Sequence, residues 1–304
     1  MATLENRFSW SKSRHEKFEA CLRQYYYQYY GSWGGWERDA PPEVRELYIL
    51  KKLTNRHAWS GTAVHDAIRR ILTLLRDGAE IDPERIVATV RASMRAQFRE
   101  SREGAYRFRK AFGLREHEYA EEVSAEEWRA SWELVESCLR AFFRSRWVDL
   151  ARSLPREAWL PIDELGSFLY RGVPVFAAPD FAFRAGGGVV LVDWKTGKAR
   201  EADRDQLLGY ALYARATWDV PLERIQGRVV YLPELDEVEV VVDDASVADF
   251  ERRMQDSIDR MRALLVDSER NLARIEDFPR TETSATCLHC AFRRPCLQQD
   301  GSAP

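Results

Sequence analysis

The chain has 304 residues, of which 45% are hydrophobic and 12% aromatic; this allows a large core and excludes an intrinsically disordered chain. The formal net charge is only −3, but residues 1–115 hold 22 Lys and Arg against 14 Asp and Glu. A basic half can attract phosphate groups, although a chance asymmetry of solvated helix faces explains the same numbers. No apolar run approaches the roughly 18 residues that cross a membrane, and the N-terminus lacks a signal-peptide stretch. We therefore expect a cytoplasmic protein with no membrane partner.

The first half of the chain is predicted to be helical. We expect a tyrosine-rich helix over residues 9–30 and an irregular, Gly- and Pro-containing segment over 31–60. Apolar residues at helical spacing predict a helix that begins near Gly61, with Ser60 or Thr62 as its cap, and ends at Gly78. Two further helices are predicted over 83–102 and about 118–150.

The pattern then changes to short β-rich runs separated by Gly or Pro. Strands are predicted over 168–170, 173–176, 181–183, 189–194, 226–232 and 238–242, with a helix over 203–216. A long amphipathic helix follows, and the tail over 279–304 is predicted to be irregular. This order indicates one integrated α/β domain, made of an N-terminal segment 1–60, a helical region 61–155, a core 156–245 and a C-terminal helix and tail 246–304.

The sharpest local pattern is an aspartate followed thirteen residues later by Asp193–Trp194–Lys195. Asp193 and Lys195 are two apart on a predicted strand, so their side chains share a face, and Trp194 points into packing. The glycines 186–188 predict a hairpin turn that brings Asp180 beside Asp193. Two clustered carboxylates favour a divalent cation, which lowers the pKa of bound water. The alternative is a strand-edge salt bridge between Lys195 and the aspartates.

Three further residues fit a site of this kind. Gln206 and Tyr210 lie four apart on the following predicted helix and share its face. His65 lies near the start of an earlier predicted helix, and a neutral imidazole is a good additional ligand for an ion such as Mn²⁺. Taken alone, His65 is more typical of an ordinary helix-surface histidine.

The five cysteines form a second pattern. Cys287, Cys290 and Cys296 follow C-x2-C-x5-C in a tail with little periodicity, and metal ligation would order such a tail. With Cys21 they make four thiolates, a set that suits either a 4Fe-4S cluster or a structural zinc, for which His289 is a substitute ligand. Cys138 lies on the apolar face of a predicted helix and indicates core packing. The aromatic run Tyr25–Tyr30 fits helix packing or stacking of single-stranded DNA.

Together these residues resemble the RecB/AddB-like nucleases of the PD-(D/E)XK superfamily, and among them the iron–sulfur exonucleases that include the CRISPR-associated Cas-four group. The matching elements, in chain order, are residues 13–30 with Cys21, then 61–65, 179–180, 193–197, 206–210 and the three tail cysteines. Aspartate stands at position 193, where many superfamily members carry glutamate.

The resemblance implies a restriction-endonuclease-like mixed sheet flanked by helices, with both ends of the chain joined at a 4Fe-4S cluster. It implies that His65, Asp180, Asp193 and the backbone carbonyl of Trp194 bind Mg²⁺ or Mn²⁺. Lys195 is then the catalytic lysine, supported by Gln206 and Tyr210, and Cys21, Cys287, Cys290 and Cys296 bind the cluster.

The function that follows is a metal-dependent DNA exonuclease acting on single strands or ends, in DNA repair, recombination or CRISPR adaptation. No GxxxxGK[ST] motif is present, so any unwinding would come from a helicase partner; CRISPR adaptation proteins are the other expected partners. The alternative function is a catalytically inactive DNA-binding or scaffold protein with a structural metal–cysteine site.

Overall fold

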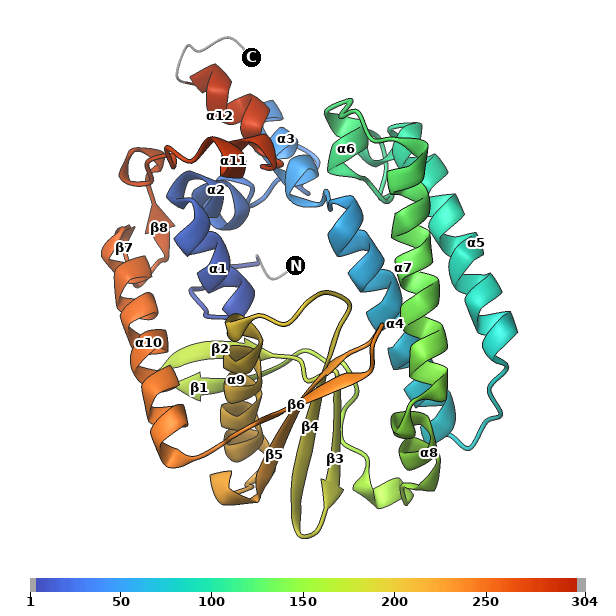
Figure 1. The fold of residues 1–304 in the computed structure, drawn as a ribbon. Helices are drawn as coiled ribbons and strands as arrows, with labels where there is room; N and C mark the ends of the chain where they lie inside the picture. The colour runs from blue at the N-terminus through green and yellow to red at the C-terminus, as the bar shows by residue number, and fades with distance from the viewer. Residues whose placement is uncertain (1–3, 300–304) are drawn as a thin grey trace.

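The computed structural model describes residues 4–299, and helices surround a four-stranded mixed sheet (Figure 1). The strand order is β3 (Phe181–Ala185), β4 (Gly188–Lys195), β5 (Ile225–Tyr231) and β6 (Asp236–Val240). The central β4–β5 pair is parallel and the two outer pairs are antiparallel. The mixed α/β architecture predicted from the sequence is confirmed. Within residues 4–299, no helix combines the length and apolar character needed to cross a membrane.

The central strand β4 is buried on both faces, as its nearly continuous apolar sequence favours. Val192 and Trp194 pack against one group of helices, α4 (Arg56–Arg76), α7 (Ala125–Arg144) and α8 (Arg146–Ser153). Val189 and Leu191 pack on the opposite face, where α9 (Glu201–Trp218) and α10 (Asp244–Ala263) lie. Since side chains alternate along a strand, Asp193 and Lys195 continue the row that faces α9.

The remaining elements are smaller. The hairpin of β1 (Gly166–Tyr170) and β2 (Val173–Ala177) packs on α9, and β7 (Leu265–Asp267) pairs with β8 (Leu272–Ala273). The helix α5 (Pro83–Arg102) packs on α7 at the right of Figure 1. Its predicted bounds, 83–102, are confirmed. Turns of 3-10 helix cover 105–107, 156–158, 222–224 and 275–277.

The predicted start of the first long helix at Gly61 is wrong. The helix α4 begins at Arg56, and the Asn55 side chain caps it by accepting hydrogen bonds from the backbone N–H groups of His57 and Ala58. Gly61 instead lies inside α4, where a Cβ would stand 3.7 Å from the Thr196 hydroxyl oxygen. Gly61 is therefore not a helix boundary, and at this position α4 meets the end of β4 at an ordinary contact distance.

Three other boundaries also differ from the prediction. The segment 31–60 contains the helix α3 (Pro42–Lys51), which has proline in its first turn, where a missing N–H costs little. The predicted helix 118–150 is divided into α6 (Arg115–Glu118), α7 and α8, because a Ser124–Glu127 capping box starts α7 afresh. The tail predicted as irregular holds α11 (Ser284–Leu288) and α12 (Arg293–Gln299), and its residues 300–304 lie outside the described range.

The predicted helix 9–30 is broken at Cys21, whose extended backbone separates α1 (Lys12–Ala20) from α2 (Leu22–Tyr26), which continues into a π-helical turn over Tyr27–Gly31. Most of the tyrosines in this region pack inward. Tyr25 and Tyr27 are fully buried, and Tyr25 stacks on Phe278 from the other end of the chain. Helix packing, and not exposure for base stacking, therefore describes these two side chains.

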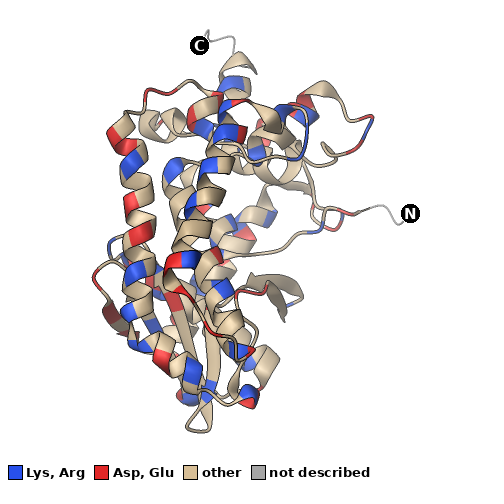
Figure 2. Cartoon of the chain, turned by 90° about the vertical axis from the view of Figure 1, so that its right-hand side faces the viewer, with Lys and Arg blue, Asp and Glu red and all other residues tan. Residues whose placement is uncertain are grey.

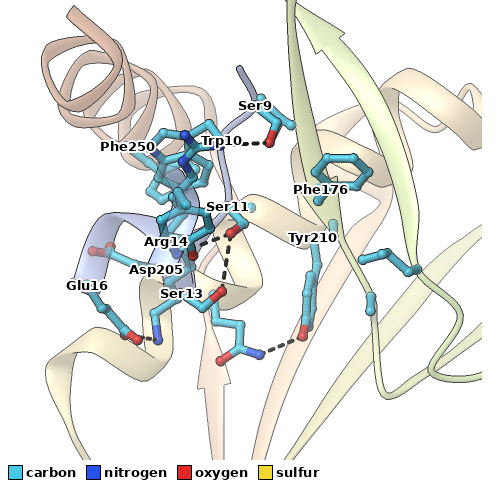
Figure 3. A pocket seen from close by; sticks show the side chains of 18 residues that line it. Ser9, Trp10, Ser11, Ser13, Arg14, Glu16, Phe176, Asp205, Tyr210 and Phe250 are labelled. Carbon is cyan, nitrogen blue, oxygen red and sulfur yellow. Dashed lines mark hydrogen bonds and ion pairs between the residues drawn. The ribbon is translucent and has the colours of Figure 1, made fainter. Parts of the chain in front are cut away.

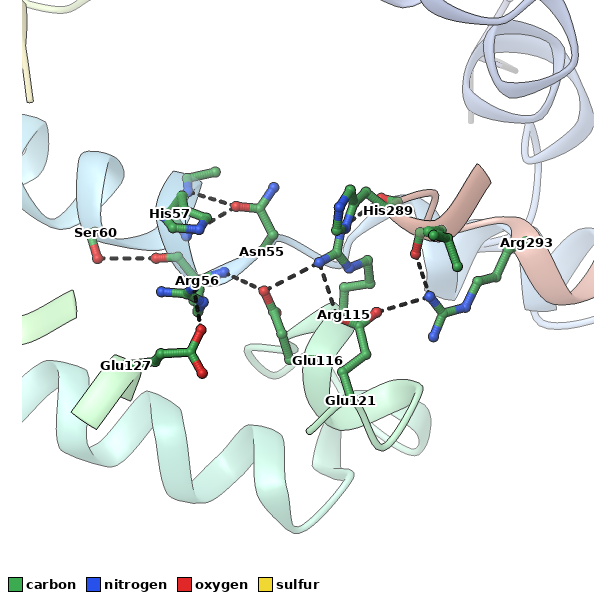
Figure 4. Close-up of polar contacts among 12 residues, drawn as sticks. Asn55, Arg56, His57, Ser60, Arg115, Glu116, Glu121, Glu127, His289 and Arg293 are labelled. Atoms are coloured by element: carbon green, nitrogen blue, oxygen red, sulfur yellow. Dashed lines mark hydrogen bonds and ion pairs between the residues drawn. The ribbon is translucent and has the colours of Figure 1, made fainter. Parts of the chain in front are cut away.

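The C-terminal tail with α11 and α12 lies against α2 at the top of Figure 1. The backbone N–H of Arg23 donates to the Pro279 carbonyl oxygen at 3.1 Å, and its side-chain Nε donates to the Phe278 carbonyl oxygen at 2.7 Å. Figure 4 shows a second connection, in which Arg115 donates to the backbone carbonyl oxygen of His289 and Arg293 pairs with Glu121. Hydrogen bonds, ion pairs and aromatic packing thus hold the tail against the N-terminal half.

Candidate active site

The hairpin between β3 and β4 places the two aspartates opposite one another. Phe181 pairs with Val192 in the antiparallel register, so Asp180, the residue before β3, lies across from Asp193. The turn uses Gly186 and Gly187 at positive φ, a conformation that glycine adopts without strain. Asp180 is held by a hydrogen bond of 2.8 Å from the Trp194 backbone N–H to its Oδ2. The hairpin geometry predicted from the sequence is confirmed.

Asp193 is the most confined group of the site, with 0% of its surface exposed. Neither of its carboxylate oxygens accepts a well-directed hydrogen bond, although Lys195 Nζ lies 2.7 Å from Oδ2 as an ion-pair partner. Burial, and after it the charge of Asp180, raises the pKa of Asp193 well above its ordinary value. A buried carboxylate with free oxygen lone pairs beside a second carboxylate is an arrangement that a bound cation would stabilise.

His65 comes to the same point from α4. Its Nδ1 lies 3.2 Å from Asp180 Oδ1. Burial lowers the pKa of His65, but the neighbouring Asp180 carboxylate outweighs burial and raises the pKa to about 9. The imidazole is therefore cationic beside the aspartates at neutral pH, and it would have to release a proton to become a metal ligand.

Lys195 is linked to the two α9 residues expected to support it. Its Nζ donates to Gln206 Oε1 at 2.8 Å, and Gln206 Nε2 in turn donates to the Tyr210 hydroxyl at 2.6 Å. Burial lowers the pKa of Lys195, but Asp193 outweighs it and leaves a net rise, so the ammonium group stays charged. Burial and then Asp193 raise the pKa of the Tyr210 hydroxyl, which stays protonated.

A cavity of about 470 Å³ opens beside this chain of hydrogen bonds. Figure 3 shows Tyr210 on one side of it and Ser11, Ser13 and Arg14, from the start of α1, on the other. The site is thus open toward the N-terminal segment of the protein.

One residue of the site was missed from the sequence. Asp203 accepts a hydrogen bond of 3.0 Å from the Tyr231 hydroxyl, and its Oδ1 lies 3.9 Å from Lys195 Nζ. The signal was present, because positions 203, 206 and 210 follow the three- and four-residue spacing of one helix face. Asp203 is thus a second carboxylate, after Asp193, that lies near the Lys195 ammonium group.

The donor set fits a hard divalent cation. Two carboxylates and an imidazole converge, and Asp193 has no hydrogen-bond donors that a metal would have to displace, apart from the Lys195 ion pair. Among residues 4–299, no three His, Cys, Asp or Glu side chains already stand as a closed metal-binding group. The cationic Lys195 and His65 now partner the two aspartates, so binding requires these contacts to rearrange. That the backbone carbonyl of Trp194 is a metal ligand stays a prediction. The Trp194 side chain packs edge-on to Phe142 and Trp147, as expected for a residue on the buried face of β4.

The four cysteines expected to act together line one small cavity of about 30 Å³. Burial raises the pKa of the Cys290 thiol to about 12, and the other three thiols act on it in the same direction. His289 is not among the residues that line this cavity and its side chain is exposed, so it does not take the place of a thiol there. Cys138 is fully buried on α7 in the core, as predicted.

Comparison with known proteins gives one finding about the whole chain. No curated protein matches it. The model of the PD-(D/E)XK nuclease superfamily matches residues 9–297, a range that includes His65, both aspartates, Lys195 and the tail cysteines. With nearly the full length matched and the Asp180–Asp193–Lys195 group assembled in space, the chain belongs to the PD-(D/E)XK nuclease superfamily.

Proposed function

We propose that this protein is a metal-dependent nuclease that hydrolyses phosphodiester bonds of DNA. The observation that carries the proposal is the pairing of Asp180 with the fully buried Asp193, whose carboxylate has no well-directed hydrogen bond and one ion-pair partner, Lys195. Asp180, Asp193 and His65, with the Trp194 carbonyl, would hold Mg²⁺ or Mn²⁺. The metal would supply neutralisation of phosphate charge and activation of water.

Lys195 has a role that follows from its own contacts. Its ammonium group stays protonated because the carboxylates of Asp193 and Asp203 lie near it. The hydrogen bond to Gln206 fixes its direction. A fixed cation beside the metal ligands would orient the attacking water and stabilise negative charge that develops on the phosphate. Gln206 and Tyr210 fix the direction of Lys195, which makes them positioning residues.

The finer assignment rests on the resemblance to the iron–sulfur exonucleases. We propose exonuclease action on single strands or on DNA ends, in repair, recombination or CRISPR adaptation, with a helicase or CRISPR adaptation proteins as partners. The alternative is an inactive DNA-binding or scaffold protein. Two observations favour the active enzyme: Lys195 contacts both Asp193 and Gln206, and Asp180 is held opposite Asp193 by the Trp194 backbone N–H.

The direct test is cleavage of end-labelled single- and double-stranded oligonucleotides with Mg²⁺, Mn²⁺ or chelator. Lys195→Ala and Asp180→Asn should abolish metal-dependent cleavage. Lys198→Ala, an exposed lysine three residues further along, is the matched control and should cleave like the wild type. Equal cleavage by all four proteins would mean that the site does not perform the reaction.

We also propose that Cys21, Cys287, Cys290 and Cys296 bind a 4Fe-4S cluster. All four thiols border one cavity, and four sulfur donors are what such a cluster takes. A zinc ion is the competing occupant: the cavity of about 30 Å³ would have to open further for a cubane cluster than for a single ion.

Metal analysis and visible absorption decide between the two occupants. Iron with a sulfur-to-iron charge-transfer band, lost in Cys287→Ser and retained in Cys138→Ala, supports the cluster. Stoichiometric zinc without visible absorption would replace the cluster by a zinc site. Protein that folds to the same stability without either metal would remove the proposal.

A further inference from the structure

The helices α5 and α7, with Trp59 of α4, border a second cavity outside the active site. It has a volume of about 380 Å³, within the range of roughly 300–1,000 Å³ that small-ligand pockets occupy. Residues 80–155, which form most of it, carry none of the catalytic groups. Figure 2 turns this side of the molecule toward the viewer and shows Lys and Arg interspersed with Asp and Glu along its helices.

The rim of this cavity carries four arginines that have no carboxylate partner. Arg91, Arg95 and Arg99 are spaced by four residues on α5 and so share one face, and Arg129 faces them from α7. Within residues 4–299, none of the four forms an ion pair. By contrast, Arg140 on the same helix α7 pairs with both Glu84 and Glu136. The four guanidinium groups therefore have no carboxylate within ion-pair distance and are available to the phosphates of a polyanion.

The wall of the cavity is aromatic. Trp59, Phe98, Trp128 and Trp132 line it, and Trp128 and Trp132 are only half-buried. Phe98 and Trp128 meet edge to face at 5.0 Å, and Arg91 lies over the Trp132 ring at 5.4 Å from its centroid. Aromatic surface between unpaired cations is the combination that binds single strands, because bases stack on the rings while phosphates contact the charges.

The cavity and the active site share the helix α4. Trp59 in the cavity wall and His65 at the metal site are six residues apart, which is about 9 Å along a helix axis. Six residues also turn the helix so that the two side chains point about 120° apart, and a strand bound in the cavity would have to pass around α4 to reach the aspartates. Base pairs present no open ring face to such a wall, so a duplex does not fit it.

We propose that the cavity between α5 and α7 binds a single-stranded segment of the nucleic-acid substrate, with a base against Trp128 and Trp132 and phosphates against the four arginines. The proposal rests on the proposed nuclease function for its substrate class, but it concerns binding and not cleavage. The two can therefore fail separately.

The test is fluorescence anisotropy with a labelled single-stranded oligonucleotide, in buffer without added divalent cation so that no cleavage occurs. Arg95→Ala/Arg99→Ala should weaken binding by about tenfold at low salt and flatten the plot of log K against log[salt] by about 1.4, since each phosphate contact on a single strand contributes about 0.7. The matched control Arg140→Ala should leave both quantities unchanged.

The stacking half of the proposal has its own measurement. The wild type should bind an abasic oligonucleotide roughly tenfold more weakly than the normal one, and Trp132→Ala should bind the two with similar affinity. Circular dichroism confirms that each variant is folded.

Unchanged affinity and salt slope in Arg95→Ala/Arg99→Ala would overturn the proposal, whether or not the wild type cleaves DNA. Tight binding of a polyglutamate peptide with unchanged DNA affinity would assign the surface to an acidic protein segment and overturn it as well. If Arg95→Ala/Arg99→Ala lost DNA binding and the wild type did not cleave DNA, the result would support the proposed binding cavity and refute the proposed nuclease function.

Discussion

Replacing Asp193 by asparagine should make the metal-free protein more stable while removing its function. The wild-type carboxylate is fully buried, faces Asp180 and has one ion-pair partner, so its charge destabilises the empty site. Asparagine has nearly the same shape as aspartate and removes the repulsion between the two carboxylates. It also removes the ion pair with Lys195, whose ammonium group keeps its contacts with Gln206 and Asp203. We expect a net gain of about 1 kcal/mol, which for a chain of 304 residues is a rise in Tm of roughly 1.5 °C.

Metal should reverse the order of stabilities. A divalent ion at 100 times its dissociation constant stabilises the wild type by about 2.7 kcal/mol, whereas the asparagine variant has lost a ligand and should gain little. Thermal unfolding with and without Mn²⁺ measures both effects. Asp205→Asn, on the surface of the same helix α9 and paired with Arg253, is the control and should respond to metal like the wild type.

The contrary result is an Asp193→Asn variant that is less stable than the wild type without metal and is stabilised by Mn²⁺ to the same extent. Such a result would mean that Lys195 fully satisfies the carboxylate and that the pair of aspartates is an ordinary salt-bridge cluster.

Three more outcomes follow from particular contacts. Tyr210→Phe removes the hydroxyl that accepts a hydrogen bond from Gln206, and since one hydrogen bond is lost, kcat should fall about tenfold with KM nearly unchanged. Steady-state kinetics measure this, and Tyr213→Phe on the same helix is the control that should keep the wild-type kcat. Gly188→Ala places a Cβ 2.1 Å from the Arg224 carbonyl oxygen, so urea unfolding should show a loss of about 2 kcal/mol in stability. Gly197→Ala, whose Cβ would have no atom within 4 Å, is the control, and equal stabilities of the two variants would contradict the predicted clash. Burial raises the pKa of Cys138 to about 12, so mass spectrometry should find it unmodified by iodoacetamide at a pH near 8, and rapid alkylation would show that the core opens.

The sequence predicted the catalytic hairpin because its signals are local. Gly186 and Gly187 form the turn, and the alternation along β4 fixes which face Asp193 and Lys195 share. The two faces of β4 then separate Trp194 from the aspartate. Local pattern and tertiary packing agree at this point, so the sequence alone predicts that Asp180 lies beside Asp193.

Other features depend on contacts between distant segments and could not be read from the pattern. Gly61 resembles a helix boundary in the sequence, but α4 begins at Arg56 because Asn55 caps it, and no apolar periodicity marks that start. The break at Cys21 and the helix α3 were also missed, since no periodicity marks them. Asp203 was overlooked because its partners are Lys195 and Tyr231, on two different strands.

The central claim is that Asp180 and Asp193 are held together to bind a divalent ion, and electron paramagnetic resonance of Mn²⁺ tests it most directly. Titration of the wild type should remove the signal of free Mn²⁺ up to saturation, and Asp180→Asn and Asp193→Asn should leave that signal nearly intact. Equal uptake of Mn²⁺ by the wild type and both variants would contradict the account.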